Sequence, residues 1–136
     1  MDTRLARAGS WLTAAVLTHL VITFVHGAAH RGAGVGLSRA AALFVLLVIE
    51  VGPVVGLVLS RYRPMAGGWT VAASMTGALV FGVVNHFVLS GPDHVGAVSA
   101  EWRPLFAASA ALLFVSELAG IAAGWRHATR ALEMGS

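Results

Sequence analysis

Apolar residues dominate four long stretches of the chain, and short segments that contain arginine, glycine or proline separate them. Each stretch can supply the ~20 residues with which a helix crosses a hydrocarbon layer of ~30 Å. The pattern therefore predicts an all-α protein, an integral membrane four-helix bundle that forms a single transmembrane domain over residues 1–136. The expected helices cover residues 9–30, 39–60, 68–90 and 104–126.

Composition agrees with this class. Hydrophobic residues make up 57% of the chain and charged residues 11%, whereas soluble domains carry about 25% charged residues. Cysteine is absent, which excludes disulfides, thiolate metal ligands and a cysteine nucleophile. A cleavable signal peptide is the alternative for the first stretch, but a signal core of about 7 to 15 residues is shorter than this run.

The chain has nine arginines and no lysine, so the arginines alone carry the positive charge that predicts its orientation in the membrane. Cytoplasmic loops of membrane proteins are enriched in positive residues, so an up-down-up-down topology with both termini cytoplasmic is expected. Dispersed arginines in short loops give no basic patch for nucleic acid, and no nucleic-acid partner is expected. Arg4, Arg7, Arg61, Arg63, Arg126 and Arg130 would lie inside, against Arg31, Arg39 and Arg103 outside.

Two carboxylates and several histidines fall within or at the ends of the apolar stretches. Glu50 and Glu117 each lie near the middle of one, where an ionised group costs roughly 2.5 to 3.5 kcal/mol unless it is paired, protonated or bound to a ligand. His19, His26 and His30 form one stripe along the first helix at 100° per residue. Polar side chains in membranes face the protein interior, so this stripe should point into the bundle.

Helix depth brings further groups toward the same site. His26 and His86 are each expected about one turn inside the outer boundary, with His30 and the Asp93–His94 loop at that boundary. Imidazole and carboxylate together suit zinc, copper or iron. The candidate metal ligands are His19, His26, His30, Glu50, His86, His94 and Glu117. No catalytic residue is assigned.

Other features are interpreted as structural. Gly52 with Gly56, and Gly120 with Gly124, have the four-residue spacing that allows close helix packing in lipid. Pro53 predicts a kink beside Glu50, because proline removes an intrahelical hydrogen bond. His127, at the inner end of the fourth helix, is expected to be solvated or lipid-facing.

The segment Asn85-His86-Phe87, followed by Pro92-Asp93-His94-Val95, resembles a stretch of small bacterial four-helix integral membrane proteins of uncharacterised function. The resemblance implies that the end of the third helix and the outer loop belong to the site, and it transfers no activity. The expected location is the bacterial inner (cytoplasmic) membrane, as a multi-pass protein.

These observations favour a membrane-embedded transition-metal-binding protein whose His/Glu site lies between the four helices and opens toward the outer face. Such a centre can be redox-active or can handle metal, and as an enzyme it would be a metal-dependent oxidoreductase. One alternative is a b-type haem electron carrier with His26 and His86 as axial ligands. Another is a small proton-coupled transporter or channel that uses His19, Glu50 and Glu117. The lipid bilayer is the expected partner, and a second copy or a partner membrane subunit is compatible with the sequence.

Overall fold

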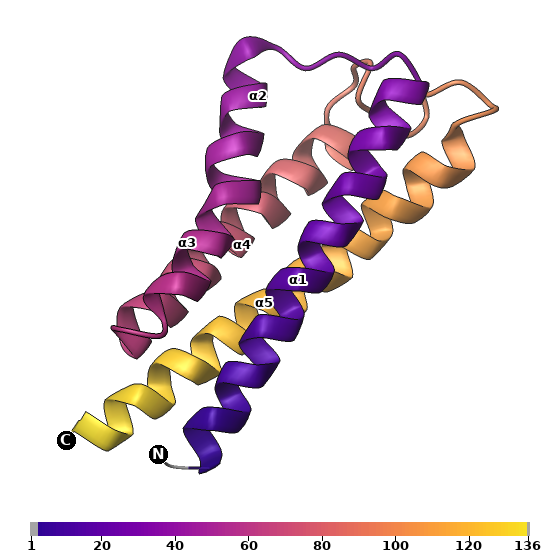
Figure 1. Cartoon of the computed structure of the whole chain (residues 1–136). Coiled ribbons are helices and arrows are strands. Elements are labelled where there is room, and N and C mark those ends of the chain that lie inside the picture. Colours follow the sequence, from indigo (N-terminus) through magenta and orange to yellow (C-terminus); the bar gives the residue numbers. More distant parts are fainter. Residues whose placement is uncertain (1–2, 136) are drawn as a thin grey trace.

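The computed structural model describes residues 3–135, and this part of the chain consists of helices and loops without strands. The elements form four long helical rods, the second and third of which include a π-helical segment; Figure 1 shows how they are arranged. In chain order the elements are α1 (Thr3–Gly32), α2 (Arg39–Phe44), η1 (Val45–Val51), α3 (Gly52–Leu59), α4 (Pro64–Val83), η2 (Val84–Val88) and α5 (Arg103–Gly135).

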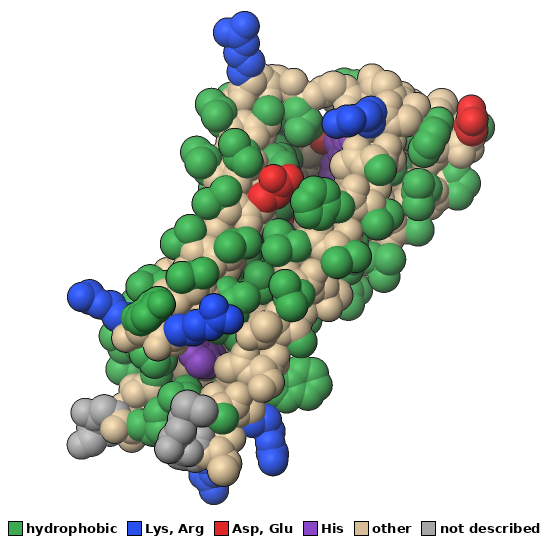
Figure 2. Space-filling view, viewed as in Figure 1, with side chains coloured by type: hydrophobic (Ala, Val, Ile, Leu, Met, Phe, Trp, Pro, Cys, Tyr) green, Lys and Arg blue, Asp and Glu red, His purple; other side chains and the backbone are tan. Residues whose placement is uncertain are grey.

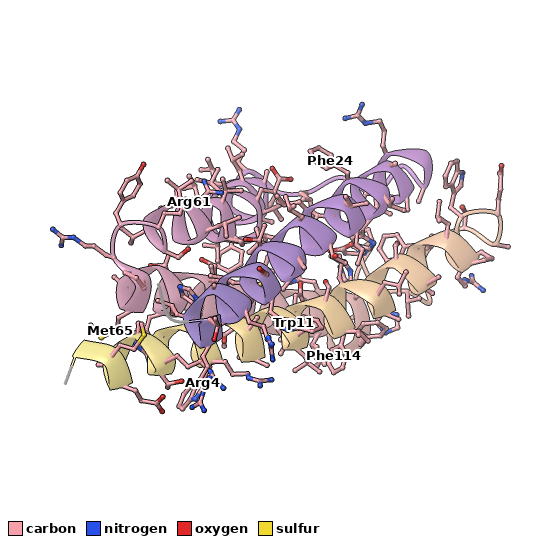
Figure 3. All side chains as sticks on the ribbon, turned by 60° about the horizontal axis from the view of Figure 1, so that its bottom comes forward. Arg4, Trp11, Phe24, Arg61, Met65 and Phe114 are labelled. Carbon is pink, nitrogen blue, oxygen red and sulfur yellow. The ribbon has the colours of Figure 1, made fainter. Side chains whose placement is uncertain are left out.

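All four rods are long and apolar enough to cross a membrane. Large apolar side chains cover their outer faces (Figure 2), and Phe24 and Val115 are 76% and 60% exposed. In Figure 3, Phe24 and Phe114 point away from the molecule on opposite sides. A surface of this kind suits hydrocarbon, and it confirms the prediction of an all-helical, multi-pass membrane protein.

Small residues allow the helices to pack closely. A Cβ atom on Gly124 would lie 2.6 Å from the carbonyl oxygen of Gly68, so α4 and α5 approach with their backbones almost in contact. A Cβ atom on Gly56 would lie 2.7 Å from a Val71 methyl group, at the contact between α3 and α4. Both glycines belong to the predicted packing pairs, and their packing role is confirmed.

The two chain ends lie at the same end of the molecule (Figure 1), here called the terminal end. The opposite end, where the connections 33–38 and 89–102 lie, is called the distal end. There α2 diverges from α1, whereas α3 contacts α1 nearer the terminal end. The 89–102 connection closes the distal end of the α1–α5 pair, because Val98 packs with Ala29 and Phe106 in a small apolar core. A cavity remains where α2 stands away.

Candidate metal centre

The third rod places His86 in the interior. His86 lies in η2, where the helix widens to the π form before it ends at the extended residue Leu89. The loop then folds back, and the Val95 N–H donates to the His86 carbonyl oxygen at 3.0 Å. This return places Asp93 beside the imidazole, with its backbone oxygen 3.1 Å and its Oδ1 3.3 Å from His86 Nδ1. π-Helical turns of this kind often mark functional sites.

The first rod brings two more imidazoles to the same point. His26 and His30 are four residues apart on α1, so they lie one above the other on one helix face. His26 Nε2 is 3.1 Å from His86 Nε2 and 3.2 Å from His30 Nε2. His30 Nε2 is also 3.2 Å from Asp93 Oδ1. The three histidines present one ligand atom each, and these atoms lie within 4.8 Å of one another.

Hydrogen bonds at Nδ1, the ring nitrogen that points away from the cluster, determine the tautomers of His26 and His86. The Asp93 backbone oxygen can only accept, so His86 Nδ1 carries a proton. The Ser109 hydroxyl donates its only hydrogen to a helix carbonyl, that of Leu105 at 2.7 Å or Phe106 at 3.1 Å. With its hydrogen placed on that carbonyl, Ser109 Oγ accepts from His26 Nδ1, 2.9 Å away. In both neutral rings the lone pair is consequently on Nε2.

Two lone pairs thus face each other across 3.1 Å between His26 and His86. They repel unless a cation lies between them, either a proton or a metal ion. A proton can bridge two nitrogens but not three, and His30 Nε2 is the third. In a tetrahedral site with metal–nitrogen bonds of about 2.0 to 2.1 Å, neighbouring ligand nitrogens are about 3.3 Å apart. The Nε2–Nε2 separations of 3.1 Å between His26 and His86 and 3.2 Å between His26 and His30 are close to this value.

The surroundings hold the rings in place. The Phe106 ring packs against all three imidazoles, with ring centroids 4.8 Å from His26 and His30 and 5.2 Å from His86. Burial opposes ionisation of Asp93, but its contact with His86 and the neighbouring imidazoles outweigh this and leave its pKa below the ordinary value. Asp93 is therefore a carboxylate that orients His86 from its Nδ1 side, as carboxylates behind metal-binding imidazoles commonly do, whereas at His30 it contacts Nε2 itself.

A cavity of about 480 Å³ adjoins the trio, and both predicted glutamates line it. Glu117 is 3% exposed and lies on α5, whereas Glu50 is half-buried in η1. Most of the other lining residues are apolar, among them Val45, Phe81 and Leu113. Figure 2 shows the hollow near the distal end, with histidine side chains visible inside it. The glutamates thus share the cavity with the trio but are not part of the cluster of three imidazoles.

His19 lies apart from the trio and has a structural partner. Its Nε2 donates to the Ile49 carbonyl oxygen at 3.1 Å. In an α-helix that carbonyl would bind the N–H four residues later, but residue 53 is proline and has none. At the position of the expected kink the helix takes the π form, in η1, which leads into Pro53, and α2 and α3 run in different directions on its two sides (Figure 1). His19 therefore satisfies an acceptor that the proline leaves open.

Two other histidines also lie outside the trio. His94 accepts the Gly96 N–H at 3.0 Å within the distal loop. His127 was expected to be solvated or lipid-facing, but this was wrong, since its side chain is 4% exposed. The reason is that α5 continues to Gly135, which places His127 within the packed part of the helix, opposite Gly9 of α1. Neither His127 ring nitrogen has a hydrogen-bond partner among residues 3–135.

Sequence reasoning did not include Asp93, Ser109 or Phe106 among the site residues. Asp93 follows His86 by seven residues in the loop assigned to the outer face, and this proximity was the available signal. Ser109 and Phe106 lie near the distal start of α5, at the depth of His26, but nothing in the sequence specifies which face of α5 meets α1.

Comparison of the chain with protein-family models, with curated proteins and with solved structures finds no match. The function is therefore inferred from the geometry of the three histidines and the cavity beside them.

Proposed function

We propose that His26, His30 and His86 bind one transition-metal ion within the membrane. The observation that carries this proposal is the convergence of three Nε2 atoms, at 3.1 and 3.2 Å, with the Nδ1 atoms of His26 and His86 engaged as donors elsewhere. An imidazole whose outer nitrogen is held in this way presents a lone pair to a metal at fixed orientation.

The donor set suits copper, zinc or iron, because imidazole is a good ligand for all three. Three protein ligands leave a coordination position free, as in catalytic zinc sites, and the adjoining cavity offers space for a further ligand or substrate. Bound copper or iron would supply electron transfer, and bound zinc would supply Lewis-acid chemistry. We infer a redox or metal-handling role, with Glu50 and Glu117 contributing negative charge from the cavity wall.

The same proposal includes the orientation in the membrane. The four rods form an up-down-up-down bundle in the bacterial inner membrane, with the terminal end in the cytoplasm. In its support, six of the nine arginines belong to the helix ends and the loop at the terminal end. The histidine trio then lies in the outer half of the bilayer, and its cavity opens on the outer side of the midplane.

The geometry favours a metal ion over haem. Two axial nitrogens on opposite sides of one iron would be about 4 Å apart, twice a typical metal–nitrogen bond, whereas His26 and His86 are 3.1 Å apart. His30 Nε2 also lies 3.2 Å from His26 Nε2, in the space that the porphyrin ring would need. A proton relay through His19 is less well supported, because His19 is bonded to the Ile49 carbonyl.

The test is elemental analysis of protein purified without chelator, combined with an absorption spectrum. We expect about one equivalent of copper, zinc or iron per chain and no Soret band. A stoichiometric Soret band would replace the metal-ion proposal with the haem alternative. Absence of stoichiometric metal, both as purified and after incubation with each of the three ions, would refute it.

A further inference from the structure

A second cavity of about 480 Å³ lies at the terminal end, between α1 and α5, far along the molecule from the histidine trio. Arginines contribute much of its wall. Arg4 and Arg7 are one turn apart on α1, and Arg126 and Arg130 are one turn apart on α5. Residues three or four apart share a helix face, so each helix presents a pair of arginines to the same groove.

The groove carries excess positive charge. In the sequence, residues 2–12 and 119–135 contain these four arginines and two carboxylates, Asp2 and Glu133. Within residues 3–135, no ion pair is formed by Arg7, Arg126 or Arg130. Arg7 also lies near the N-terminus of α1, the positive end of the helix dipole, which disfavours a cation there and favours an anion. A bound anion would offset this concentration of charge.

The remainder of the groove is apolar. Ala119, Ala122 and Ala123 line it on the α5 side, and the 68% exposed Trp11 lines it on the α1 side. These residues lie deeper in the membrane spans than the arginines. Tryptophan with an apolar surface below and cations above matches the profile of the membrane interface. The alanines leave a shallow channel that continues from the arginines toward the bilayer centre.

We propose that this groove binds an anionic phospholipid, with the headgroup phosphate between the arginine pairs and an acyl chain along the alanine channel. Arginine guanidinium groups bind phosphate oxygens in bidentate fashion, and basic pockets between membrane helices are typical sites for anionic headgroups. The apolar floor is the reason to favour a lipid over free phosphate. The proposal is independent of the metal centre.

The test uses the full chain, delipidated in mild detergent and titrated with phosphatidylglycerol or with phosphatidylcholine of the same acyl chains, with binding measured by native mass spectrometry. The Arg7→Gln/Arg126→Gln variant should bind phosphatidylglycerol roughly 30-fold more weakly than the unaltered protein, since each arginine near an anionic surface contributes about a factor of five. Phosphatidylcholine should bind more weakly than phosphatidylglycerol to the unaltered protein.

A matched control is the Arg61→Gln/Arg63→Gln variant, which also removes two exposed arginines from the terminal end. In Figure 3, Arg4 and Arg61 project on different sides of the molecule, and neither Arg61 nor Arg63 lines the groove. This variant should keep its affinity for phosphatidylglycerol. Equal affinities of the two double variants, or equal binding of the two lipids, would overturn the proposal.

A second variant tests the lipid assignment without removing charge. Ala122→Leu should narrow the apolar channel and weaken phosphatidylglycerol binding. Inorganic phosphate should compete with phosphatidylglycerol for the variant as weakly as it does for the unaltered protein. If inorganic phosphate at the same concentration displaces phosphatidylglycerol completely and Ala122→Leu has no effect, the groove is a phosphate site and the lipid proposal is wrong.

Discussion

Replacing His86 with alanine removes one of the three converging imidazoles and leaves Asp93 without the ring that it orients. Loss of a group that merely orients a metal ligand costs 10- to 100-fold in metal affinity. Loss of the ligand itself should cost at least the upper value, about 100-fold. His86→Ala should therefore lose most of its bound metal during purification.

The same loss can be expressed as a free energy of unfolding. At a free metal concentration 100 times the dissociation constant, binding raises the free energy of unfolding of the wild-type protein by about 2.7 kcal/mol. For a variant with 100-fold weaker affinity, the same metal concentration contributes only about 0.4 kcal/mol. Thermal unfolding in detergent, with and without added metal, measures this difference, and elemental analysis measures the bound metal directly.

His127→Ala is the matched control. His86 and His127 are 5% and 4% exposed, so both substitutions leave a cavity of imidazole size in the interior. His127 belongs to the terminal end and contacts none of the trio. Only His86→Ala should lose the stabilisation that metal provides. If both variants retain their full metal content, or lose metal to the same extent, the proposal that three histidines bind one metal ion is wrong.

Three further outcomes are expected. Glu117→Gln should lower metal affinity by less than His86→Ala does, because Glu117 lies in the cavity wall and affects the metal ion only through its charge. Metal titration of the two variants compares their affinities. A loss of affinity equal to that of His86→Ala would make Glu117 a direct ligand. Acidification should lower metal affinity, because protonated imidazole has no lone pair to donate. Burial of the rings disfavours their protonation, so release should require a pH below about 5. Dialysis at a series of pH values followed by elemental analysis measures this, and a metal content that does not change down to about pH 3 would contradict histidine ligation. Reporter fusions after Ser136 should signal from the cytoplasm, as the arginine distribution predicts; a signal from the outer compartment alone would invert the topology.

Helix depth was predictable from the sequence, but the rotation of each helix was not. Counting residues placed His26, His30 and His86 at one level, and the structure brings them together there. The transporter alternative grouped His19 with Glu50 and Glu117, yet His19 forms a hydrogen bond with the Ile49 carbonyl oxygen, which Pro53 leaves open. Counting at 100° per residue assumes regular α-helix, and the π-helical segments η1 and η2 break that assumption.

The sequence also did not show which residues of other helices would contact the histidines. Ser109 accepts a hydrogen bond from His26 only because α5 turns that face toward α1, and contacts elsewhere along α5, such as that of Gly124 with Gly68 of α4, fix this rotation. His127 was misjudged for a related reason, since the end of an apolar run does not show where the helix itself ends.

The sequence by itself determined the class of the protein and its four membrane spans. Hydrocarbon thickness and the cost of unpaired backbone groups in lipid act on each segment separately, so length and polarity suffice. It also determined that His26 and His30 share a helix face, because their spacing is local. Tertiary structure alone decided that His86 completes the trio, that Asp93 and Ser109 hold the tautomers, and that a cavity adjoins them. These features depend on how four helices rotate and diverge relative to one another, which is decided by packing between segments far apart in the chain.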